Sequence, residues 1–425
     1  MIAQTKWHAT LWLSFKENTM RSYLQFALSN RRFVGFGFLM AFSSSFGQTY
    51  FIAVFGPEIQ REFSLSHTEW GLVYMLGTMA SAVVLPITGK LIDEIALQRY
   101  TTAVVLALAG ACVFVALVPS VWILIVAIFL LRQTGQGLSS HISSTSMARY
   151  FDSARGRAIA VSALGFAVGE ACLPFIATQA IGMFGWRLSY VLVAVAQAGL
   201  MLPILLWLLR GHEQRHQAYL QRVQRRSASA TGDTFGWTRG QVIRDQRFYL
   251  MLPGLMAPSL VLTGLFFHHL NVADAKQWSH SWMTGSYIIY ALATVTTSLI
   301  SGHLVDRLGA IRVVPAMLGP MCAGMALLAL GDNLWLVWPY MVLIGVSSGV
   351  TYTALSAMWA ELYGTVHIGA IKSLAIALGV LASGLGPVCI GVMLDGGLGI
   401  DAILWSGVMY GLLSALLLRL ALATR

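Results

Sequence analysis

The sequence predicts an all-α integral membrane protein with twelve transmembrane helices, arranged as two pseudo-symmetric six-helix bundles with both termini in the cytoplasm. Three observations support this fold class: the composition, a repeated loop motif and the distribution of basic residues. Of the 425 residues, 57% are hydrophobic and 10% are charged, whereas an ordinary soluble domain carries about 25% charged residues. The chain is therefore expected to lie in a lipid bilayer.

Apolar segments long enough to cross a membrane recur along the whole chain. About 20 mostly apolar residues are needed to cross roughly 30 Å of hydrocarbon as a helix. In the first half such segments are predicted at 33–55, 69–90, 100–118, 121–145, 157–180 and 187–209. In the second half they are predicted at 248–270, 282–303, 311–330, 335–358, 369–393 and 402–420.

A loop motif occurs twice, at a spacing of half the chain. Gly-Lys-Leu-Ile-Asp follows the second predicted span at 89–93, and Gly-His-Leu-Val-Asp follows the eighth at 302–306, which is 302 − 89 = 213 residues later. Halves related by such a repeat are typical of secondary transporters, in which two bundles rock about a site between them. The expected bundles are residues 33–209 and 247–425.

The basic residues indicate the orientation of the chain. The net charge of +10 could by itself indicate a nucleic-acid partner. With the N-terminus in the cytoplasm, however, the outer connections contain only Arg61, Arg187 and Lys276, and Arg132 lies within a span, so 27 − 3 − 1 = 23 basic residues lie near the cytoplasmic side. This positive-inside pattern predicts a multi-pass protein of the cell (inner) membrane, with the lipid bilayer as a partner and no nucleic acid.

Two segments outside the bundles are expected on the cytoplasmic side. Residues 1–32 mix aromatic and basic side chains and lack the pattern of a cleavable signal peptide, so a cytoplasmic or interfacial segment is predicted there. Residues 210–246 are predicted as a basic cytoplasmic linker between the bundles. Contact with anionic lipid headgroups is favoured for this linker over a specific regulatory partner.

Arg132 and Glu170 are the two charged residues predicted near the middle of the membrane. Arg132 lies about eleven residues into the fourth span and Glu170 about thirteen into the fifth, so both lie roughly 16–20 Å from their helix starts. A charge at this depth costs about 2.5–3.5 kcal/mol and normally faces a cavity or a partner. The repeat aligns Arg132 with Ile344 or Gly345, and Glu170 with 383–385, so symmetry does not require either charge.

Two interpretations of this pair remain open. The two residues could form a purely structural ion pair. Alternatively, Arg132 binds a substrate carboxylate while Glu170 carries a proton, because an anion at Arg132 would raise the proton affinity of the nearby carboxyl. The second interpretation predicts symport of an anion with a proton.

Further polar residues in the predicted spans are candidates for the same site. The substrate-binding candidates are Ser44, Gln48, Gln136 and Tyr352, and the additional candidate for proton coupling is His268. Helix–helix hydrogen bonding is the alternative for each polar residue, and interfacial packing is the alternative for His268. The sequence shows no metal-ligand spacing, phosphate loop or nucleophile–base pattern, so no metal, no cofactor and no enzymatic activity are predicted.

The repeated loops resemble the paired G-x-L-x-D loops of the major facilitator superfamily, and the resemblance covers nearly the whole chain. Residues 150–158 with Gly165 and Gly169, together with Gly386-Pro387, resemble its monocarboxylate-transporter-like and oxalate/formate-antiporter-like branch. The resemblance implies a monomer. It also implies gating roles in the two loops for Gly89, Asp93, Gly302, Asp306 and Arg307.

The chain also departs from the patterns of this superfamily. The first loop continues with Glu94-Ile95-Ala96, where the family usually shows a basic residue and Gly. The eighth span carries no charged residue from 282 to 301, so the Asp/Arg pair of animal monocarboxylate transporters has no counterpart there. Gly169 is followed by Glu170, where drug/proton antiporters usually have Pro.

The expected function is secondary active transport of a small organic anion, a carboxylate, by alternating access and proton symport. The expected partners are a small-molecule substrate and protons. Two alternatives remain: an exporter or antiporter of a metabolite or drug-like compound, and a transporter-like sensor that does not transport. A sensor would be expected to carry a substantial cytoplasmic output domain, whereas the longest soluble stretch is the basic linker.

Overall fold

The structure is a computed structural model that describes residues 25–151, 154–217, 219, 236–364 and 367–423. Most of the predicted N-terminal segment and residues 220–235 of the predicted linker lie outside the described residues. The described residues form helices and turns without a β-strand, apart from one isolated bridge between Gly236 and Gly364. The predicted all-α membrane fold is confirmed at this level.

The first half of the chain contains several long helical stretches and three short α-helices among its described residues. The membrane helices are α2 (Arg31–Ser44), α5 (His67–Gly89), α7 (Leu97–Ala116), α8 (Val121–Leu131), α9 (Ser140–Tyr150), α10 (Arg155–Val195) and α11 (Leu202–Leu208). Two π-helical segments continue these helices, η3 (Arg132–Ser139) between α8 and α9, and η4 (Ala196–Met201) between α10 and α11. The short helices are α3 (Thr49–Ile52), α4 (Gly56–Phe63) and α6 (Leu91–Glu94).

The second half has a similar series of helices. Its long helices are α14 (Gln246–Ala257), α15 (Thr263–Ala275), α17 (Tyr287–Leu308), α19 (Leu318–Ala329), α20 (Val337–Tyr363), α21 (Ile368–Asp395) and α22 (Ile400–Ala423). The π-helical segment η5 (Pro258–Leu262) joins α14 to α15. The short helices are α13 (Arg239–Arg244), α16 (His280–Gly285) and α18 (Ala310–Val313).

Ten helical stretches in the described part of the chain are long and apolar enough to cross a membrane. The pair Arg31–Gly47 and Thr49–Phe63, bent by 48°, would be an eleventh span. The longest stretch, Arg155–Leu208, has 54 residues and is interrupted at Gly185, where φ is 75° and ψ is 163°. A straight helix of that length would extend about 80 Å, far more than the roughly 30 Å of a bilayer core.

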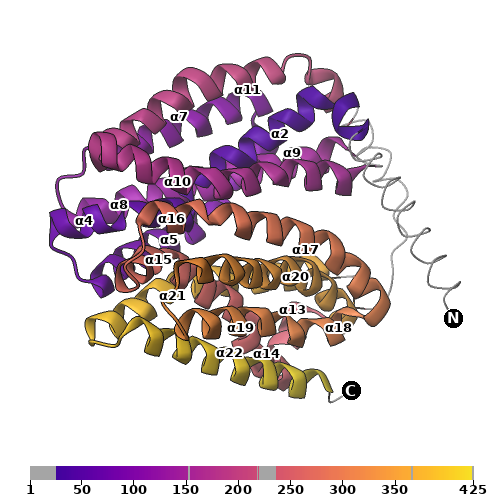
Figure 1. Ribbon diagram of the computed structural model, residues 1–425. Coiled ribbons are helices and arrows are strands. Elements are labelled where there is room, and N and C mark those ends of the chain that lie inside the picture. Colours follow the sequence, from indigo (N-terminus) through magenta and orange to yellow (C-terminus); the bar gives the residue numbers. More distant parts are fainter. Residues whose placement is uncertain (1–24, 152–153, 218, 220–235, 365–366, 424–425) are drawn as a thin grey trace, which may run out of the picture.

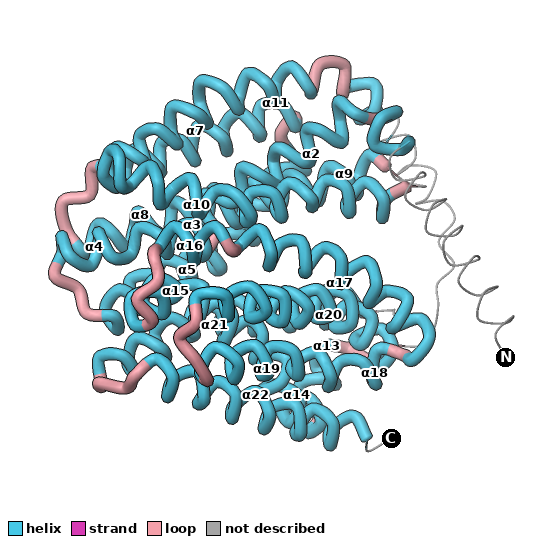
Figure 2. The backbone as a smooth tube through the Cα atoms, viewed as in Figure 1, coloured by secondary structure: helices cyan, strands magenta, loops and turns pink. Residues whose placement is uncertain are grey.

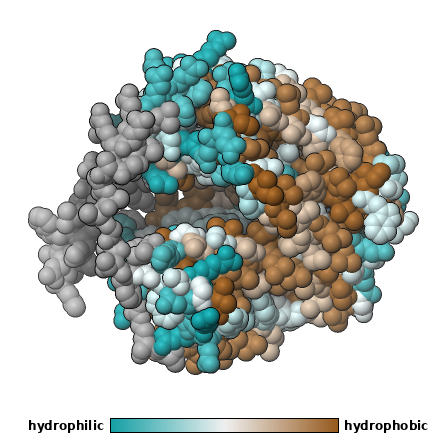
Figure 3. All heavy atoms as spheres, turned by 180° about the vertical axis from the view of Figure 1, so that it is seen from behind, coloured by the Kyte–Doolittle hydropathy of each residue, from teal (hydrophilic) through white to brown (hydrophobic). Residues whose placement is uncertain are grey.

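The two halves of the chain form two groups of helices that lie side by side (Figures 1 and 2). Helix α5 packs against α21, and α10 packs against α17, so each half contributes two helices to the junction. Apolar side chains cover much of the outer surface in Figure 3, and leucines of α17 and α22 such as Leu299 and Leu412 are more than half exposed. In a bilayer these side chains face lipid rather than water.

Candidate functional site

A cavity of about 630 Å³ lies between the two halves. Gln48 and residues from α3, η3 and α10 line it from the first half, and residues from α14, η5, α15, α17, α20 and α21 line it from the second. Its polar lining consists of Gln48, Thr49, Tyr50, Arg132, Gln136, Glu170, Ser259, Thr263, Tyr290, Ser348, Thr351, Tyr352, Ser356, Lys372 and Ser383. Apolar walls with a few polar groups are typical of a binding site for a small molecule.

Arg132 is fully buried at the wall of this cavity, with 1% of its surface exposed. Its Nη1 donates a hydrogen bond of 3.1 Å to the carbonyl oxygen of Gly47, and its guanidinium carbon lies 5.1 Å from the centre of the Tyr74 ring. Its Nε has no hydrogen-bond partner among the described residues. The guanidinium is thus held in place while part of its donor capacity is unused.

The contact between Arg132 and Gly47 depends on close packing of two backbones. A Cβ atom at Gly47 would lie 2.2 Å from the carbonyl oxygen of Leu131 and 2.8 Å from the Cα atom of Gly135. Only glycine permits this approach. Gly47 therefore allows the chain that follows α2 to lie directly against η3 at the depth of Arg132.

The π-helical turn in η3 distributes its side chains between two environments. Arg132 and Gln136 line the cavity. Gln133 instead accepts a hydrogen bond of 2.9 Å from Ser81 and donates one of 2.7 Å to Thr88, both on α5. Single π-helical turns are frequent at functional sites because they change the direction of side chains within a continuous helix.

Glu170 lies on α10 at the same cavity and is 7% exposed. Its carboxyl makes no hydrogen bond or ion pair with the described residues, and in particular none with Arg132. Tyr50, Tyr290 and Tyr352 line the same cavity as this carboxyl. The two mid-membrane charges thus share one cavity without being paired to each other.

The other candidate binding residues from the sequence divide into two groups. Gln48, Gln136 and Tyr352 line the cavity together with Arg132 and Glu170. Ser44 is buried and donates a hydrogen bond of 2.6 Å to the Ala41 carbonyl of its own helix, away from the cavity lining. The structure therefore brings together three of the four predicted polar neighbours.

His268 lies at the junction of the two halves and does not line the cavity. Its Nε2 is 2.9 Å from the carbonyl oxygen of Pro387, and its Nδ1 is 3.1 Å from Oδ1 of Asn271. The backbone departs from helical geometry here, with φ of −108° and ψ of 15°. The adjacent His269 points into a different, buried polar environment.

Several cavity residues were not predicted from the sequence. Lys372 lines the cavity, and its Nζ donates a hydrogen bond of 2.8 Å to the Ser356 hydroxyl. Tyr290 also lines it and is hydrogen-bonded at 2.9 Å to Ser348, which lies on α20 with the predicted Tyr352. The position of Lys372 only five residues into α21 was the one available signal, and it equally fits a lysine at a lipid interface.

Contacts between the halves close the cavity at the end where α5 begins. The Asp395 carboxylate at the end of α21 accepts hydrogen bonds of 3.0 and 2.8 Å from the backbone amides of His67 and Thr68. Thr178 on α10 is 3.1 Å from Thr284 on α16, between their hydroxyl oxygens. Figure 3 shows a hollow between the halves at the left of the view, so the described residues close the cavity at one end only.

The repeated loops lie at the opposite end from this closure. Asp93 forms an ion pair with Arg149 of the same half, and Arg149 also donates a hydrogen bond of 3.2 Å to the Ile92 carbonyl. Gly89 lies close to His141, since a Cβ there would be 3.7 Å from the ring. Among the described residues, Asp306 and Arg307 make no hydrogen bond or ion pair to the first half, and a Cβ added at Gly302 would meet nothing within 4 Å.

The apolar helices and the cavity between two halves define a multi-pass membrane transporter. A family model of the Major Facilitator Superfamily matches residues 37–387 and 272–425. The chain belongs to this superfamily of membrane transporters, and the predicted family is confirmed. No curated protein matches the chain in a sequence search.

Proposed function

We propose that this transporter moves small organic carboxylates together with protons by alternating access. The observation that carries the proposal is that Arg132 and Glu170 line one cavity between the halves without pairing to each other. A buried ion pair would have satisfied both groups and explained them structurally. Two buried groups of opposite charge that are left unpaired at one cavity favour a role for each in binding.

Arg132 is the proposed anchor for the substrate carboxylate. A guanidinium presents a planar fork that matches the two oxygens of a carboxylate, and hydrogen bonds between ionised groups are about twice as strong as neutral ones. The Nε without a partner is one arm of such a fork. Gln48, Gln136 and Tyr352 are proposed to contact the rest of the substrate. Ser44 is proposed to stabilise the end of α2 behind them.

Glu170 is the proposed proton carrier. A carboxylate bound at Arg132 adds negative charge to a cavity of low dielectric, which favours the protonated form of a neighbouring carboxyl. Bound substrate and bound proton therefore favour one another, which is the requirement for symport. His268 is proposed to assist at the closed end of the cavity, where its ring centre lies 6.1 Å from that of His67 in the first half.

Further features of the proposal concern the whole chain. We assign twelve membrane crossings, because the bent pair 31–63 supplies one and the break at Gly185 divides 155–208 into two. The bundles are residues 33–209 and 247–425, both termini lie in the cytoplasm, and the protein acts as a monomer in the cell (inner) membrane. The loop residues Gly89, Asp93, Gly302, Asp306 and Arg307 gate the inner end, and the branch is the monocarboxylate-transporter-like or oxalate/formate-antiporter-like one.

The proposal is tested by measuring internal pH in proteoliposomes that contain the purified protein. Short mono- and dicarboxylates are added one at a time under an imposed proton gradient. Wild type is expected to acidify the interior with one class of acid, and Arg132→Ala is expected to abolish the response. Arg61→Ala serves as the control, because that side chain is 73% exposed at the outer surface.

Three other outcomes would change or overturn the proposal. Substrate-dependent alkalinisation in place of acidification would favour an exporter that exchanges protons for its substrate. An unchanged response in Arg132→Ala would remove the proposed anchor. The absence of flux for every acid, with specific binding of one of them, would favour a transporter-like sensor.

A further inference from the structure

The proposed anchor Arg132 is fully buried without an acidic partner. Its surface is 1% exposed, and no carboxylate among the described residues forms an ion pair with it. Its two polar contacts are the Gly47 carbonyl oxygen, 3.1 Å from Nη1, and the ring of Tyr74, whose centre lies 5.1 Å from the guanidinium carbon. A buried charge is costly unless it has partners, so the Tyr74 ring is a main source of stabilisation for this cation.

Close packing of α5 on its neighbours brings Tyr74 to this position. A Cβ at Gly77 would lie 2.9 Å from the backbone nitrogen of Phe129 on α8. One turn further along α5, the Ser81 hydroxyl donates a hydrogen bond of 2.9 Å to Gln133 of η3. Tyr74, Gly77 and Ser81 are three and four residues apart and lie on one face of α5, so this face packs against α8 and η3.

The Tyr74 ring is held in place by two further contacts. Its hydroxyl is hydrogen-bonded at 2.5 Å to the hydroxyl of Thr49, which lines the cavity. Its ring packs against Phe267 of α15 in the second half, with 4.8 Å between ring centres. Tyr74 is 0% exposed. The ring is therefore fixed from both halves and has little freedom to turn away from Arg132.

An aromatic face stabilises a cation in a different way from a carboxylate. The negative face of the ring attracts the positive charge as a whole, most strongly where water is excluded. It does not occupy a particular N–H donor, whereas an acidic partner would bond to the same donors that a substrate carboxylate needs. The Nε of Arg132, which has no hydrogen-bond partner among the described residues, is one such free donor.

We propose that Tyr74 is a positioning residue for substrate binding, which holds the Arg132 guanidinium through the face of its ring and leaves its donors available to a carboxylate. This inference rests on the proposed role of Arg132 as the anchor. Tyr74 does not line the cavity, so it acts on the substrate through Arg132 and Thr49. A purely structural role between α5 and α15 would depend on the size of the ring but not on its charge distribution.

The experiment changes the charge distribution of the ring while keeping its shape. Tyr74 is replaced by phenylalanine and then by phenylalanines that carry increasing numbers of fluorine atoms, which withdraw negative charge from the ring face. Initial rates of uptake into proteoliposomes give the KM and the maximal rate of each variant. The probe is the radiolabelled acid, among acetate, lactate, oxalate and succinate, that wild type takes up fastest.

The matched control is the same series of replacements at Tyr190. This tyrosine of the first half is also 0% exposed. Its ring packs on Phe55 with 4.1 Å between ring centres, and it lies outside the cavity lining. The control therefore reports what fluorine does to the packing of two buried rings without a guanidinium.

The KM is expected to rise with each added fluorine at position 74, by about tenfold across the series. The reason is that a guanidinium that loses its cation–π contact is no longer held for the carboxylate. The maximal rate should change by less than about twofold, because the change affects the binding of substrate. Tyr74→Phe keeps the ring face and loses only the bond to Thr49, so its KM should rise less than the KM of the fluorinated variants.

The outcomes separate this inference from the proposed function. If wild type takes up none of the acids, or if Arg132→Ala transports as well as wild type, the proposed anchor is wrong and the inference falls with it. If Arg132→Ala loses uptake but fluorine at position 74 changes the KM no more than it does at position 190, Tyr74 is structural and only the inference is overturned. A KM that falls as fluorine is added would mean that the ring competes with the substrate for the guanidinium, which also overturns the positioning role. Because the ring nearly keeps its size throughout, this decision does not depend on whether a larger change at position 74 would fold.

Discussion

At the scale of single residues, depth along a helix was enough to bring Arg132 and Glu170 to one cavity. Both lie near the centres of their predicted spans, and a charge at that depth must face a polar space or a partner. The depth of a residue along its helix does not give the direction in which its side chain points. Gln133 follows Arg132 directly but bonds to Ser81 and Thr88 of α5, because η3 has the wider turn of a π-helix.

The two histidines of α15 show the same limit. Adjacent residues on a helix point about 100° apart, so the sequence predicts that at most one of the two faces the cavity, and His268 is the candidate. The non-helical φ and ψ at His268 change the local rotation of the helix, and neither ring lines the cavity. Such a local departure depends on tertiary contacts, here with Pro387 and Asn271, which no sequence pattern encodes.

Arg132→Lys tests whether the fork of the guanidinium matters or only its charge. Lysine keeps a positive charge but offers a single ammonium group instead of two parallel N–H donors. Loss of one charge-assisted hydrogen bond costs about 1.5–3 kcal/mol, so the KM for the transported carboxylate should rise roughly tenfold or more. Initial rates of uptake over a range of substrate concentrations measure this, and an unchanged KM would rule out recognition through the fork.

At the scale of elements, glycines of α10 determine how closely α2 approaches that helix. A Cβ at Gly165 on α10 would lie 1.9 Å from the carbonyl oxygen of Phe38, a backbone atom that cannot move aside without displacing α2. The spacing Gly165-x-x-x-Gly169 in the sequence agrees with this contact, since small residues four apart lie on one face of a helix. The partner helix could not be identified from the spacing alone.

Gly165→Ala should therefore destabilise the protein although alanine favours helices. The methyl group overlaps backbone atoms, and overpacking of this kind typically costs about 1–3 kcal/mol. The control is Gly182→Ala on the same helix, where an added Cβ meets nothing within 4 Å and the greater helix propensity of alanine should leave stability unchanged or slightly higher. Thermal unfolding of the purified variants in detergent measures both, and equal unfolding temperatures would contradict the close packing of α10 on α2.

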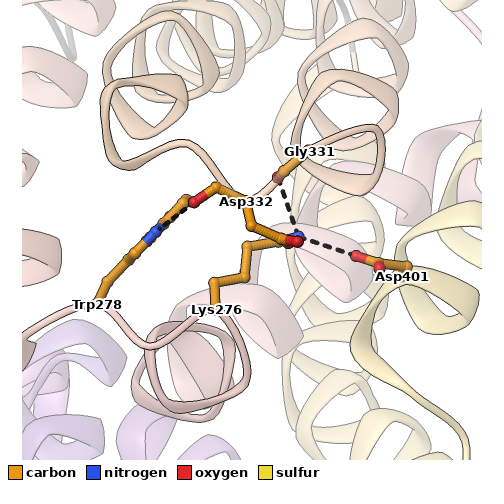
Figure 4. A network of polar contacts seen from close by, with 5 residues as sticks. All are labelled: Lys276, Trp278, Gly331, Asp332 and Asp401. Atoms are coloured by element: carbon orange, nitrogen blue, oxygen red, sulfur yellow. Dashed lines mark hydrogen bonds and ion pairs between the residues drawn. The ribbon is translucent and has the colours of Figure 1, made fainter.

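A lysine clamp, formed by Lys276, Asp332 and Asp401, joins the end of α15, the loop after α19 and the start of α22 (Figure 4). Nζ of Lys276, directly after α15, lies 2.7 Å from Asp332 and 3.0 Å from Asp401, and it also donates to the Gly331 carbonyl at 3.1 Å. Its side chain is only 2% exposed. Burial alone would lower the pKa of the Lys276 ammonium, but the hydrogen bonds and charges of Asp332 and Asp401 outweigh burial and raise this pKa above its ordinary value.

Lys276→Met is expected to lower the thermal stability of the protein. The two carboxylates are 77% and 55% exposed and can be hydrated after the change, so the loss should be about 1–2 kcal/mol, below the 3–5 kcal/mol typical of breaking a fully buried pair. A group with a raised pKa stabilises the fold fully below its unfolded pKa and loses this effect as the pH rises through the folded pKa. The difference between wild type and Lys276→Met should accordingly persist at neutral pH and shrink at strongly alkaline pH, and a difference that grows there would contradict the clamp.

At the scale of the whole molecule, the composition and the repeat predicted the membrane fold and the family, because both depend on averages over many residues. The sequence could not predict in this way which end of the cavity is closed in the structure. The described arrangement is closed at the end where Asp395 meets α5, and this contact joins residues more than 300 positions apart. Each half can make its own helices without it, so the sequence of neither half indicates the contact.

Asp395→Ala should open the closed end more often. The carboxylate binds two amides at the start of α5, where the helix dipole also favours a negative charge, and hydrogen bonds to a charged group are worth about 1.5–3 kcal/mol. Their loss should shift the equilibrium between the closed and open forms of this end about tenfold or more toward the open form. The readout is the labelling rate of Thr284→Cys by a membrane-impermeant maleimide, in a chain whose four cysteines have been replaced, because Thr284 is buried against Thr178 at this junction.

The control for this experiment is Asp274→Ala, which removes an acidic side chain near the same end of the molecule. Oδ1 of Asp274 lies 2.7 Å from Nε2 of His280, and both residues belong to the second half, so the loss of this contact leaves the junction between the halves intact. Faster labelling in Asp395→Ala alone would identify the α21–α5 contact as a closure of the transport pathway. Equal labelling in both variants and wild type would mean that apolar packing, such as Trp70 on Phe267 with ring centres 5.3 Å apart, holds this end closed without help from the carboxylate.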